Sequence, residues 1–113
     1  MEDLLKVIKK AGFKGDVDTK VVTRDFYSHD ASMFELMPEA VLSPKDSDDV
    51  KVIVSEVAKS KKKNKRHVSI TARGGGTDMS GGAISQSIVL DMTKHLNNIF
   101  EVDSSSARAQ PGV

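Results

Sequence analysis

The fold of this chain is decided by the stretch Arg73-Gly74-Gly75-Gly76-Thr77-Asp78-Met79-Ser80-Gly81-Gly82-Ala83, which is called the glycine loop below. It carries five glycines in nine positions and directly follows a stretch rich in β-branched residues. Because glycine has no Cβ atom, such a backbone can adopt positive φ and lets another group approach its amide nitrogens closely. Successive exposed N–H groups form a concave surface that favours anions. The glycine loop therefore predicts a phosphate site, and a diphosphate cofactor is the first hypothesis.

Neither of the two familiar phosphate-binding motifs fits the glycine loop. Counted from Gly74, the dinucleotide-binding motif G-x-G-x-x-G has Met79 where its third glycine should stand. Gly76 and Gly81 have the spacing of the P-loop, but the Lys and Ser/Thr that should follow and hold phosphate and magnesium are absent. A P-loop kinase or ATPase is therefore disfavoured. From the glycines alone, a loop without any ligand remains an open alternative.

The residues before the glycine loop predict a strand, a helix and a second strand. Ala40–Ser43 is a short apolar strand, and His67–Ala72 is the second one. Between them, apolar residues recur with the spacing of one helical face, and these are Val50, Ile53, Val54, Val57 and Ala58. Such a βαβ unit predicts parallel strands with a right-handed crossover. The glycine loop then leaves the carboxyl end of the second strand, where α/β sheets usually place ligands.

Polar residues predict where the helices begin and end. Asp46 or Ser47 is expected to cap the helix of the βαβ unit. Near the N-terminus, Asp3 is expected to cap a helix that ends at Lys10, with Gly12 as its stop signal. Residues 13–20 predict a turn, and residues 21–30 are compatible with either a helix or irregular structure.

The chain after the glycine loop predicts three further strands. Ile88–Met92 is an apolar run typical of a buried strand, while Ile99–Val102 and Ala107–Gln110 predict a hairpin around Asp103 and three serines. The sequence then stops at Pro111-Gly112-Val113. The whole pattern predicts an α+β fold made of a βαβ unit and further strands.

Composition limits the classes of function. The chain has 113 residues, enough for one domain, and its net charge of +1 gives no reason to expect nucleic acid as a partner. The absence of cysteine excludes a disulfide framework and a thiolate metal site. No apolar run approaches the roughly 20 residues of a membrane span, and the charged N-terminus does not resemble a secretory signal. A cytoplasmic protein without a transmembrane segment is expected.

Some residues that attract attention have ordinary interpretations. The cationic run Lys59–Arg66 lies at the predicted end of a helix, where positive charge complements the helix dipole, and it lacks the aromatic residues that stack on bases. His29, His67 and His95 fall in different elements and have no metal-ligand spacing, and His95 is expected at the surface. Asp30 and Asp91 are expected to accept hydrogen bonds from nearby backbone groups, not to act as catalytic acids.

Six motifs in a fixed order resemble the start of a known domain. The motifs are Tyr27–Ser32, P-E-A-V-L-S-P-K-D-S-D-D-V from Pro38 to Val50, A-R-G-G-G-T-D-M-S-G-G-A from Ala72 to Ala83, S-I-V-L-D-M from Ser87 to Met92, I-F-E-V-D from Ile99 to Asp103, and A-Q-P-G-V from Ala109 to Val113. From Tyr27 onward, the chain therefore resembles the FAD-binding domain of the vanillyl-alcohol oxidase and p-cresol methylhydroxylase superfamily, and within it the branch of glycolate oxidase subunits and D-lactate dehydrogenases.

The resemblance implies that main-chain N–H groups of the glycine loop bind the pyrophosphate of FAD. The implied cofactor-binding residues are Arg73, Gly74, Gly75, Gly76, Thr77, Asp78, Ser80, Gly81, Gly82, Pro111 and Gly112. Arg73 is alternatively an anchor for the loop or the partner of a carboxylate. Asp78 departs from the family, where a small neutral residue is commoner, and it is expected to point away from the diphosphate or to pair with a cation.

The resemblance also implies how FAD is held and what it does. Some relatives attach the flavin covalently to a histidine near this loop, but Thr77 stands there, so bound FAD is expected to dissociate. The complete protein is expected to oxidise a small 2-hydroxy acid such as D-lactate or glycolate. Residues 1–30 are expected to form a helical or irregular lead-in, and residues 31–113 the first, truncated subdomain of a p-cresol methylhydroxylase-type FAD-binding domain.

Because the family domain is longer, this chain is expected to be an N-terminal fragment with weak or no flavin binding and no turnover. Unpaired strand edges make self-association an expectation as well. A small non-enzymatic module that binds a nucleotide or phosphate is the main alternative, and a reductase of sugar nucleotides is a weaker third.

Overall fold

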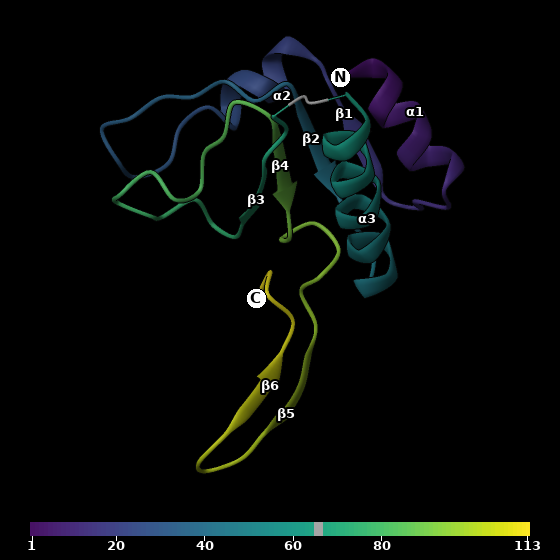
Figure 1. Ribbon diagram of the computed structural model, residues 1–113. Coiled ribbons are helices and arrows are strands. Elements are labelled where there is room, and N and C mark those ends of the chain that lie inside the picture. The colour runs from purple at the N-terminus through teal and green to yellow at the C-terminus, as the bar shows by residue number, and fades with distance from the viewer. Residues whose placement is uncertain (65–66) are drawn as a thin grey trace.

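The computed structural model of this protein describes residues 1–64 and 67–113 and has an α+β architecture (Figure 1). The elements are α1 (Glu2–Lys10), β1 (Asp16–Asp18), α2 (Val21–Phe26), β2 (Ala40–Ser43), α3 (Ser47–Asn64), β3 (Ile70–Arg73), β4 (Ile88–Asp91), β5 (Ile99–Val102) and β6 (Ala107–Ala109). The first four strands make one sheet, and β5 and β6 make a separate hairpin. The predicted fold class is confirmed.

The sheet has the strand order β1-β2-β4-β3. β4 runs parallel to both of its neighbours, so that Leu90 lies beside Leu42 on one side and beside Ala72 on the other. The two strands of the predicted βαβ unit, β2 and β3, therefore point the same way, as expected. They are not adjacent, however, because β4 lies between them. The loop after β3 and the chain after β4 consequently leave the same edge of the sheet.

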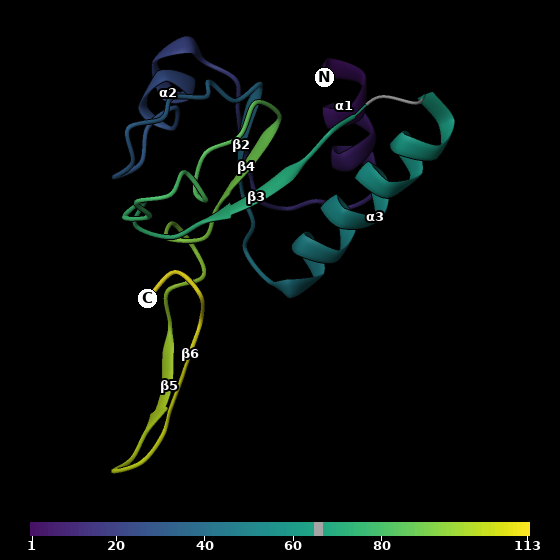
Figure 2. The ribbon, with the colours of Figure 1, turned by 60° about the vertical axis from the view of Figure 1, so that its left-hand side comes forward.

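The hydrophobic core lies between the sheet and two helices. α1 and α3 pack against each other on one side of the sheet (Figure 2). All four residues of β2 and all four of β4 are buried, as expected for the two central strands. The core residues are Leu5, Ile8, Phe13, Ala40, Leu42, Ile53, Val57, Val68, Ile88, Leu90, Met92 and Leu96. Burying such side chains contributes roughly 1.5–3 kcal/mol each, which fixes the sheet that carries the glycine loop.

The two ends of α3 confirm part of the prediction. Asp46 caps the helix, because its Oδ1 accepts the backbone N–H of Asp49 at 2.9 Å. The apolar face is narrower than predicted: Ile53 and Val57 are buried, whereas Val54 is half-exposed and Ala58 is exposed. Lysines occupy the last turn of α3, as expected. The end of the cationic run, Lys65 and Arg66, lies outside the described residues.

Three features before the glycine loop differ from the sequence prediction. α1 has no side-chain cap, and Asp3 lies inside its first turn, so the expected cap is wrong, although the helix ends where predicted. Asp16–Asp18 forms an edge strand antiparallel to β2 where a turn was predicted. A three-residue strand with two charged side chains carries no periodic signal in the sequence. The strand forms only because it pairs with β2, which lies further along the chain. β3 begins at Ile70, three residues later than expected.

The hairpin β5–β6 projects away from the rest of the molecule (Figure 1). All of its strand residues are exposed, including Ile99, Phe100 and Val102. Its tip is held by Asp103, whose Oδ1 accepts the backbone N–H of Ser105 at 2.7 Å and of Ser106 at 2.8 Å. The predicted hairpin is thus confirmed, although its second strand ends at Ala109, one residue earlier than predicted.

Candidate functional site

The glycine loop leaves the carboxyl end of β3 and borders an open hollow of about 330 Å³. The hollow is lined by Ala72, Gly74, Gly75, Gly76, Thr77, Asp78, Gly82 and Ala83. Six of these are predicted cofactor-binding residues, so the structure brings most of the predicted set together around one concave surface. With so few side chains in its wall, the hollow presents mainly backbone atoms.

The first half of the glycine loop has free donors. Within residues 1–64 and 67–113, no hydrogen bond involves the amide N–H of Gly74, Gly75, Gly76 or Thr77. These four residues are exposed or partly exposed and follow one another along the wall of the hollow, so a ligand can reach them. Such a series of N–H groups is suited to an anion with several oxygen atoms, which is what a diphosphate is.

Arg73 lies buried beneath the loop. Its Nη1 donates to the carbonyl oxygen of His29 at 2.6 Å and is 3.4 Å from that of Ala83, and its Cζ lies 5.1 Å from the centroid of the Tyr27 ring. No carboxylate forms an ion pair with this guanidinium in the described part of the chain. The sequence left three roles open for Arg73: contact with the phosphate, anchor of the loop, or partner of a carboxylate. The geometry favours the anchor, since the side chain contacts the carbonyl oxygens of His29 and of Ala83 at the end of the loop.

The packing of Arg73 explains one glycine of the loop. Gly76 has φ of +70°, and a Cβ atom there would lie 2.7 Å from Arg73 Cζ. Both the backbone conformation and the contact with the guanidinium therefore require glycine at this position. By contrast, a Cβ atom on Gly75 would meet only Thr77 Cγ2, at an ordinary 3.7 Å.

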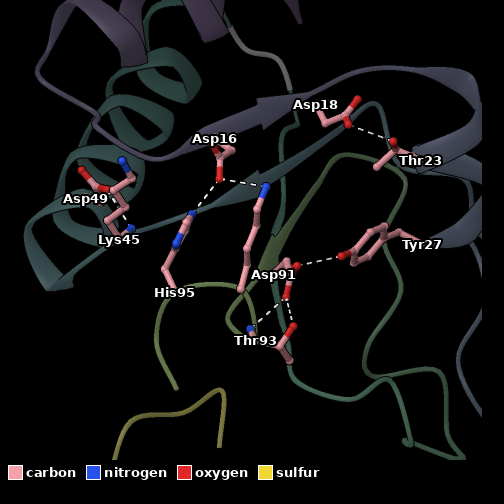
Figure 3. Close-up of polar contacts among 10 residues, drawn as sticks. Asp16, Asp18, Thr23, Tyr27, Lys45, Asp49, Asp91, Thr93 and His95 are labelled. Carbon is pink, nitrogen blue, oxygen red and sulfur yellow. Dashed lines mark hydrogen bonds and ion pairs between the residues drawn. The ribbon is translucent and has the colours of Figure 1, made fainter. Parts of the chain in front are cut away.

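Tyr27 connects Arg73 to the end of β4, and Figure 3 shows its hydrogen bond to Asp91. Its hydroxyl donates to Asp91 Oδ2 at 2.7 Å, while Asp91 Oδ1 accepts the backbone N–H and the hydroxyl of Thr93 at 2.8 and 2.6 Å. Burial and the neighbouring Asp91 carboxylate raise the pKa of Tyr27 to about 12. Burial acts to raise the pKa of Asp91 as well, but the hydrogen bonds from Thr93 and Tyr27 outweigh it and leave that pKa below its ordinary value. Asp91 thus has the structural role that the sequence predicted.

Asp30 ties the far end of the glycine loop to the segment before β2. Its Oδ1 accepts the backbone N–H of Ser32 at 2.9 Å, and its Oδ2 is 3.4 Å from the backbone nitrogen of Ala83. Hydrogen bonds from Ser32 are the main reason that the pKa of Asp30 lies below its ordinary value. The expected structural role of this carboxylate agrees with these contacts.

Asp78 behaves differently from the expectation. Its carboxylate does not pair with a cation among the described residues, and instead it turns onto its own loop. Oδ1 accepts the backbone N–H of Ser80 at 2.7 Å and that of Gly82 at 2.9 Å. Two amides from the second half of the loop are therefore occupied by a side chain of the protein itself.

Pro111 and Gly112 approach the start of the loop from the end of the hairpin. A Cβ atom on Gly74 would lie 3.9 Å from the Pro111 carbonyl oxygen. The N–H of Gly112 donates to the Leu96 carbonyl at 2.7 Å, and a Cβ atom on Gly112 would collide with the carbonyls of Met92 and Leu96. In this structure the glycine is required by contact with the protein's own backbone.

Two polar clusters have no counterpart in the sequence analysis. His95 was expected at the surface, but only about a quarter of its side chain is exposed (27%), and its Nε2 lies 2.6 Å from Asp16 Oδ2 (Figure 3). This contact joins β1 to the loop after β4, which no local pattern can reveal.

The structure also brings the side chains of Asp25, His29 and Glu35 together. One potential metal-ligand atom of each lies within 4.8 Å of the other two, and all three residues are exposed.

Comparison with known proteins agrees with the predicted fold and cofactor. Residues 38–113 match the family described as FAD binding domain, and the chain belongs to this family. Its cofactor is accordingly FAD. None of the helices in the described residues has the length and apolar character needed to cross a bilayer.

The similar curated proteins are D-2-hydroxyglutarate dehydrogenases and a glycolate oxidase subunit. D-2-hydroxyglutarate dehydrogenase of Escherichia coli (strain K12) is 35% identical over 115 residues, covering 98% of this chain and 11% of the relative. Glycolate oxidase subunit GlcD of Bacillus subtilis (strain 168) is 31% identical over 116 residues, covering 99% of this chain and 23% of the relative. The chain thus spans about a tenth of the length of the dehydrogenases it matches, as a third relative, from Pseudomonas putida, also shows at 10%.

Solved structures share the fold at lower identity. An alkyldihydroxyacetonephosphate synthase superposes with a TM-score of 0.70 at 20% identity, covering 91% of this chain and 20% of the other. The 4-ethylphenol oxidase from Gulosibacter chungangensis superposes with a TM-score of 0.68 at 19% identity, covering 99% and 22%. The predicted membership in the vanillyl-alcohol oxidase and p-cresol methylhydroxylase superfamily is confirmed, and the chain is part of such a domain.

Proposed function

We propose that the glycine loop binds the diphosphate of FAD non-covalently through the N–H groups of Gly74, Gly75, Gly76 and Thr77. The observation that carries this proposal is the series of four amides without a partner along one open hollow. The hydroxyl of Thr77 is a further donor in the wall of the hollow. No histidine stands in the loop, so the flavin has no imidazole there for covalent attachment and is expected to dissociate.

The charge of Arg73 supports an anionic ligand at this loop. A buried guanidinium without a carboxylate partner leaves positive potential beneath the amides, and such a charge interacts more strongly in a protein interior than in water. A diphosphate above the loop would add negative charge near the guanidinium, in addition to the Asp30 carboxylate, whose pKa Arg73 also helps to lower. Arg73 then contributes through the electric field and by anchoring the loop, without touching the phosphate.

The other predicted cofactor-binding residues surround this centre. Gly81 and Gly82 give the second half of the loop its turn, with φ of +84° at Gly81. Along the chain, Asp78 and Ser80 lie between these two glycines and the residues with free amides. Pro111 and Gly112 bring the end of the hairpin against Gly74, where we propose that they line the path of the cofactor.

The complete protein is proposed to be an FAD-dependent dehydrogenase of small 2-hydroxy acids. Relatives named for D-2-hydroxyglutarate and glycolate support this substrate class, and the D-lactate or glycolate type is our specific proposal. FAD supplies the hydride-accepting chemistry when bound, and the residues of this chain bind and orient it. Within the chain, we propose residues 31–113 as the FAD-binding part and residues 1–30 as a lead-in, whose helix adds Leu5 and Ile8 to the common core.

Self-association through open strand edges is also proposed. β1 and β3 are the edges of the sheet, and the exposed hairpin adds Ile99, Phe100 and Val102. Exposed edges with apolar side chains favour pairing between chains. Sedimentation at rising protein concentration tests this proposal, and a constant monomer mass would reject it.

The proposed function is tested by titrating the chain with FAD, ADP, riboflavin and inorganic phosphate. Weak binding of FAD and ADP by this chain is expected, with still weaker binding of riboflavin, because riboflavin lacks the diphosphate. If all phosphate-containing ligands bind equally and the flavin ring adds nothing, the alternative of a general phosphate-binding module is favoured. Binding of riboflavin as strong as that of FAD would contradict a diphosphate site.

A further inference from the structure

The carboxylate of Asp78 occupies a position in the glycine loop that would suit an external anion. Its Oδ1 accepts two backbone N–H groups, from Ser80 and Gly82, at 2.7 and 2.9 Å. The same residue lines the hollow together with the free amides of Gly74–Thr77. A Cβ atom on Gly82 would lie 3.1 Å from Asp78 Oδ2, so the carboxylate also lies directly against the backbone at Gly82.

This arrangement divides the amides of the loop into two groups. Those of Gly74–Thr77 are free, while those of Ser80 and Gly82 already have an anionic acceptor. Hydrogen bonds to an ionised acceptor are stronger than neutral ones, so a ligand gains little by competing for these two. A diphosphate beside the same carboxylate is in addition repelled, because like charges in close contact oppose binding.

We infer that Asp78 is an intramolecular competitor of the diphosphate, and that it lowers the affinity of the glycine loop for FAD. The inference rests on the proposed function, since it concerns the same loop and the same ligand. Asp78 is therefore an affinity-determining residue, and FAD binding is favoured when its carboxylate turns away from the loop. The consequence is a cofactor that binds more weakly than the four free amides alone would allow.

The opposite role for Asp78 makes a different prediction. If its two hydrogen bonds mainly hold the loop in shape, the charge is unimportant and an asparagine should serve equally well. Asp78→Asn keeps an oxygen that can accept both N–H groups, removes the charge, and replaces the second carboxylate oxygen by an NH2 group. Asp78→Ala removes the charge and both hydrogen bonds. The two variants together separate competition from support of the loop.

The chain offers a matched control at the tip of the hairpin. Asp103 accepts two backbone N–H groups with one oxygen, as Asp78 does, but it lies in the projecting β5–β6 hairpin. Asp103→Asn changes the net charge by the same amount and likewise affects a carboxylate that accepts two backbone N–H groups of its own loop. Any effect that both asparagine variants share is then a property of net charge and not of the loop.

The test measures dissociation constants of pyrophosphate, ADP and FAD from the amide signals of Gly74–Thr77 in NMR titrations. We expect Asp78→Asn to bind all three about tenfold more tightly than the unmodified chain, a gain that shrinks at high salt, with Asp103→Asn unchanged. Equal affinities for Asp78→Asn and the unmodified chain would overturn the inference. A result in which Asp78→Ala binds more weakly than the unmodified chain while Asp78→Asn does not bind more tightly would also overturn it, because the carboxylate would then only support the loop. If no variant binds any of the three ligands, the proposed function itself fails, and this outcome is distinct from equal binding.

Discussion

Replacing Gly76 by alanine tests whether the glycine loop depends on the buried Arg73. Gly76 has φ of +70°, and an added Cβ atom would lie 2.7 Å from Arg73 Cζ and 3.0 Å from its Nε. The guanidinium cannot remain where it is, and its 2.6 Å hydrogen bond to the His29 carbonyl is expected to break. Loop conformation and side-chain anchor are thereby disturbed at once.

The magnitude follows from these two effects. A left-handed backbone costs an alanine roughly 1–2 kcal/mol more than a glycine. Losing a partly buried hydrogen bond from a charged donor costs about 1.5–3 kcal/mol. Because Arg73 can recover part of this energy by relaxing, we expect the free energy of unfolding to fall by about 3 kcal/mol. With typical stabilities of roughly 5–15 kcal/mol, the variant still folds.

Urea denaturation of Gly76→Ala, with Gly75→Ala as its control, measures this effect. The control adds the same methyl group one position earlier, where it meets only Thr77 Cγ2 at 3.7 Å and φ is not positive. At a slope of about 2 kcal/mol per molar urea, the midpoint of Gly76→Ala is expected to fall by about 1.5 M. Gly75→Ala should stay within about 1 kcal/mol of the unmodified chain. Equal midpoints for the two variants would refute the packing of Arg73 beneath the loop.

Two further predictions concern polar groups that hold the sheet and the loop together. The single tyrosine, Tyr27, should titrate with a pKa of about 12 in the folded chain, so its contribution to stability is complete below pH 10 and is lost as the pH rises toward 12. Phenolate absorbance measures this pKa. Asp91→Asn should lower the pKa of Tyr27 toward 10 without reaching it, because burial is the larger cause of the shift. An unchanged pKa would reject the hydrogen bond between Tyr27 and Asp91. Asp49 is buried and accepts two backbone N–H groups, so Asp49→Asn should reduce the free energy of unfolding by about 2 kcal/mol in urea. Exposed Asp48, changed to Asn in parallel, should cost less than about 1 kcal/mol, and equal losses would contradict the account of Asp49.

Local patterns in the sequence predicted the elements whose residues carry their own signal. Ala40–Ser43 and Ile88–Asp91 are short apolar runs, and both form central strands whose residues are all buried. Asp46 is a residue type that prefers the N-cap, and it caps α3. The glycine loop follows β3 because the glycines mark the point at which the strand pattern ends. These features depend on neighbours within a few positions along the chain.

Features that depend on distant contacts could not be predicted in this way. β4 lies between β2 and β3 because of packing over the whole sheet, and Asp16–Asp18 becomes a strand only by pairing with β2. His95 and Asp16 are far apart in sequence, and their contact requires the finished fold. The direction of the Asp78 side chain was predicted from repulsion by a ligand, but in the folded chain the amides of Ser80 and Gly82 are nearer partners.

The central claim is that the free amides of the glycine loop hold the diphosphate of FAD. It is tested most directly by titrating the ¹⁵N-labelled chain with FAD and with riboflavin and following every backbone amide. The account predicts that FAD shifts the amide signals of Gly74, Gly75, Gly76 and Thr77 most strongly, and that riboflavin leaves these four signals in place. Saturable FAD binding whose largest shifts fall elsewhere, with these four amides unmoved, would contradict it.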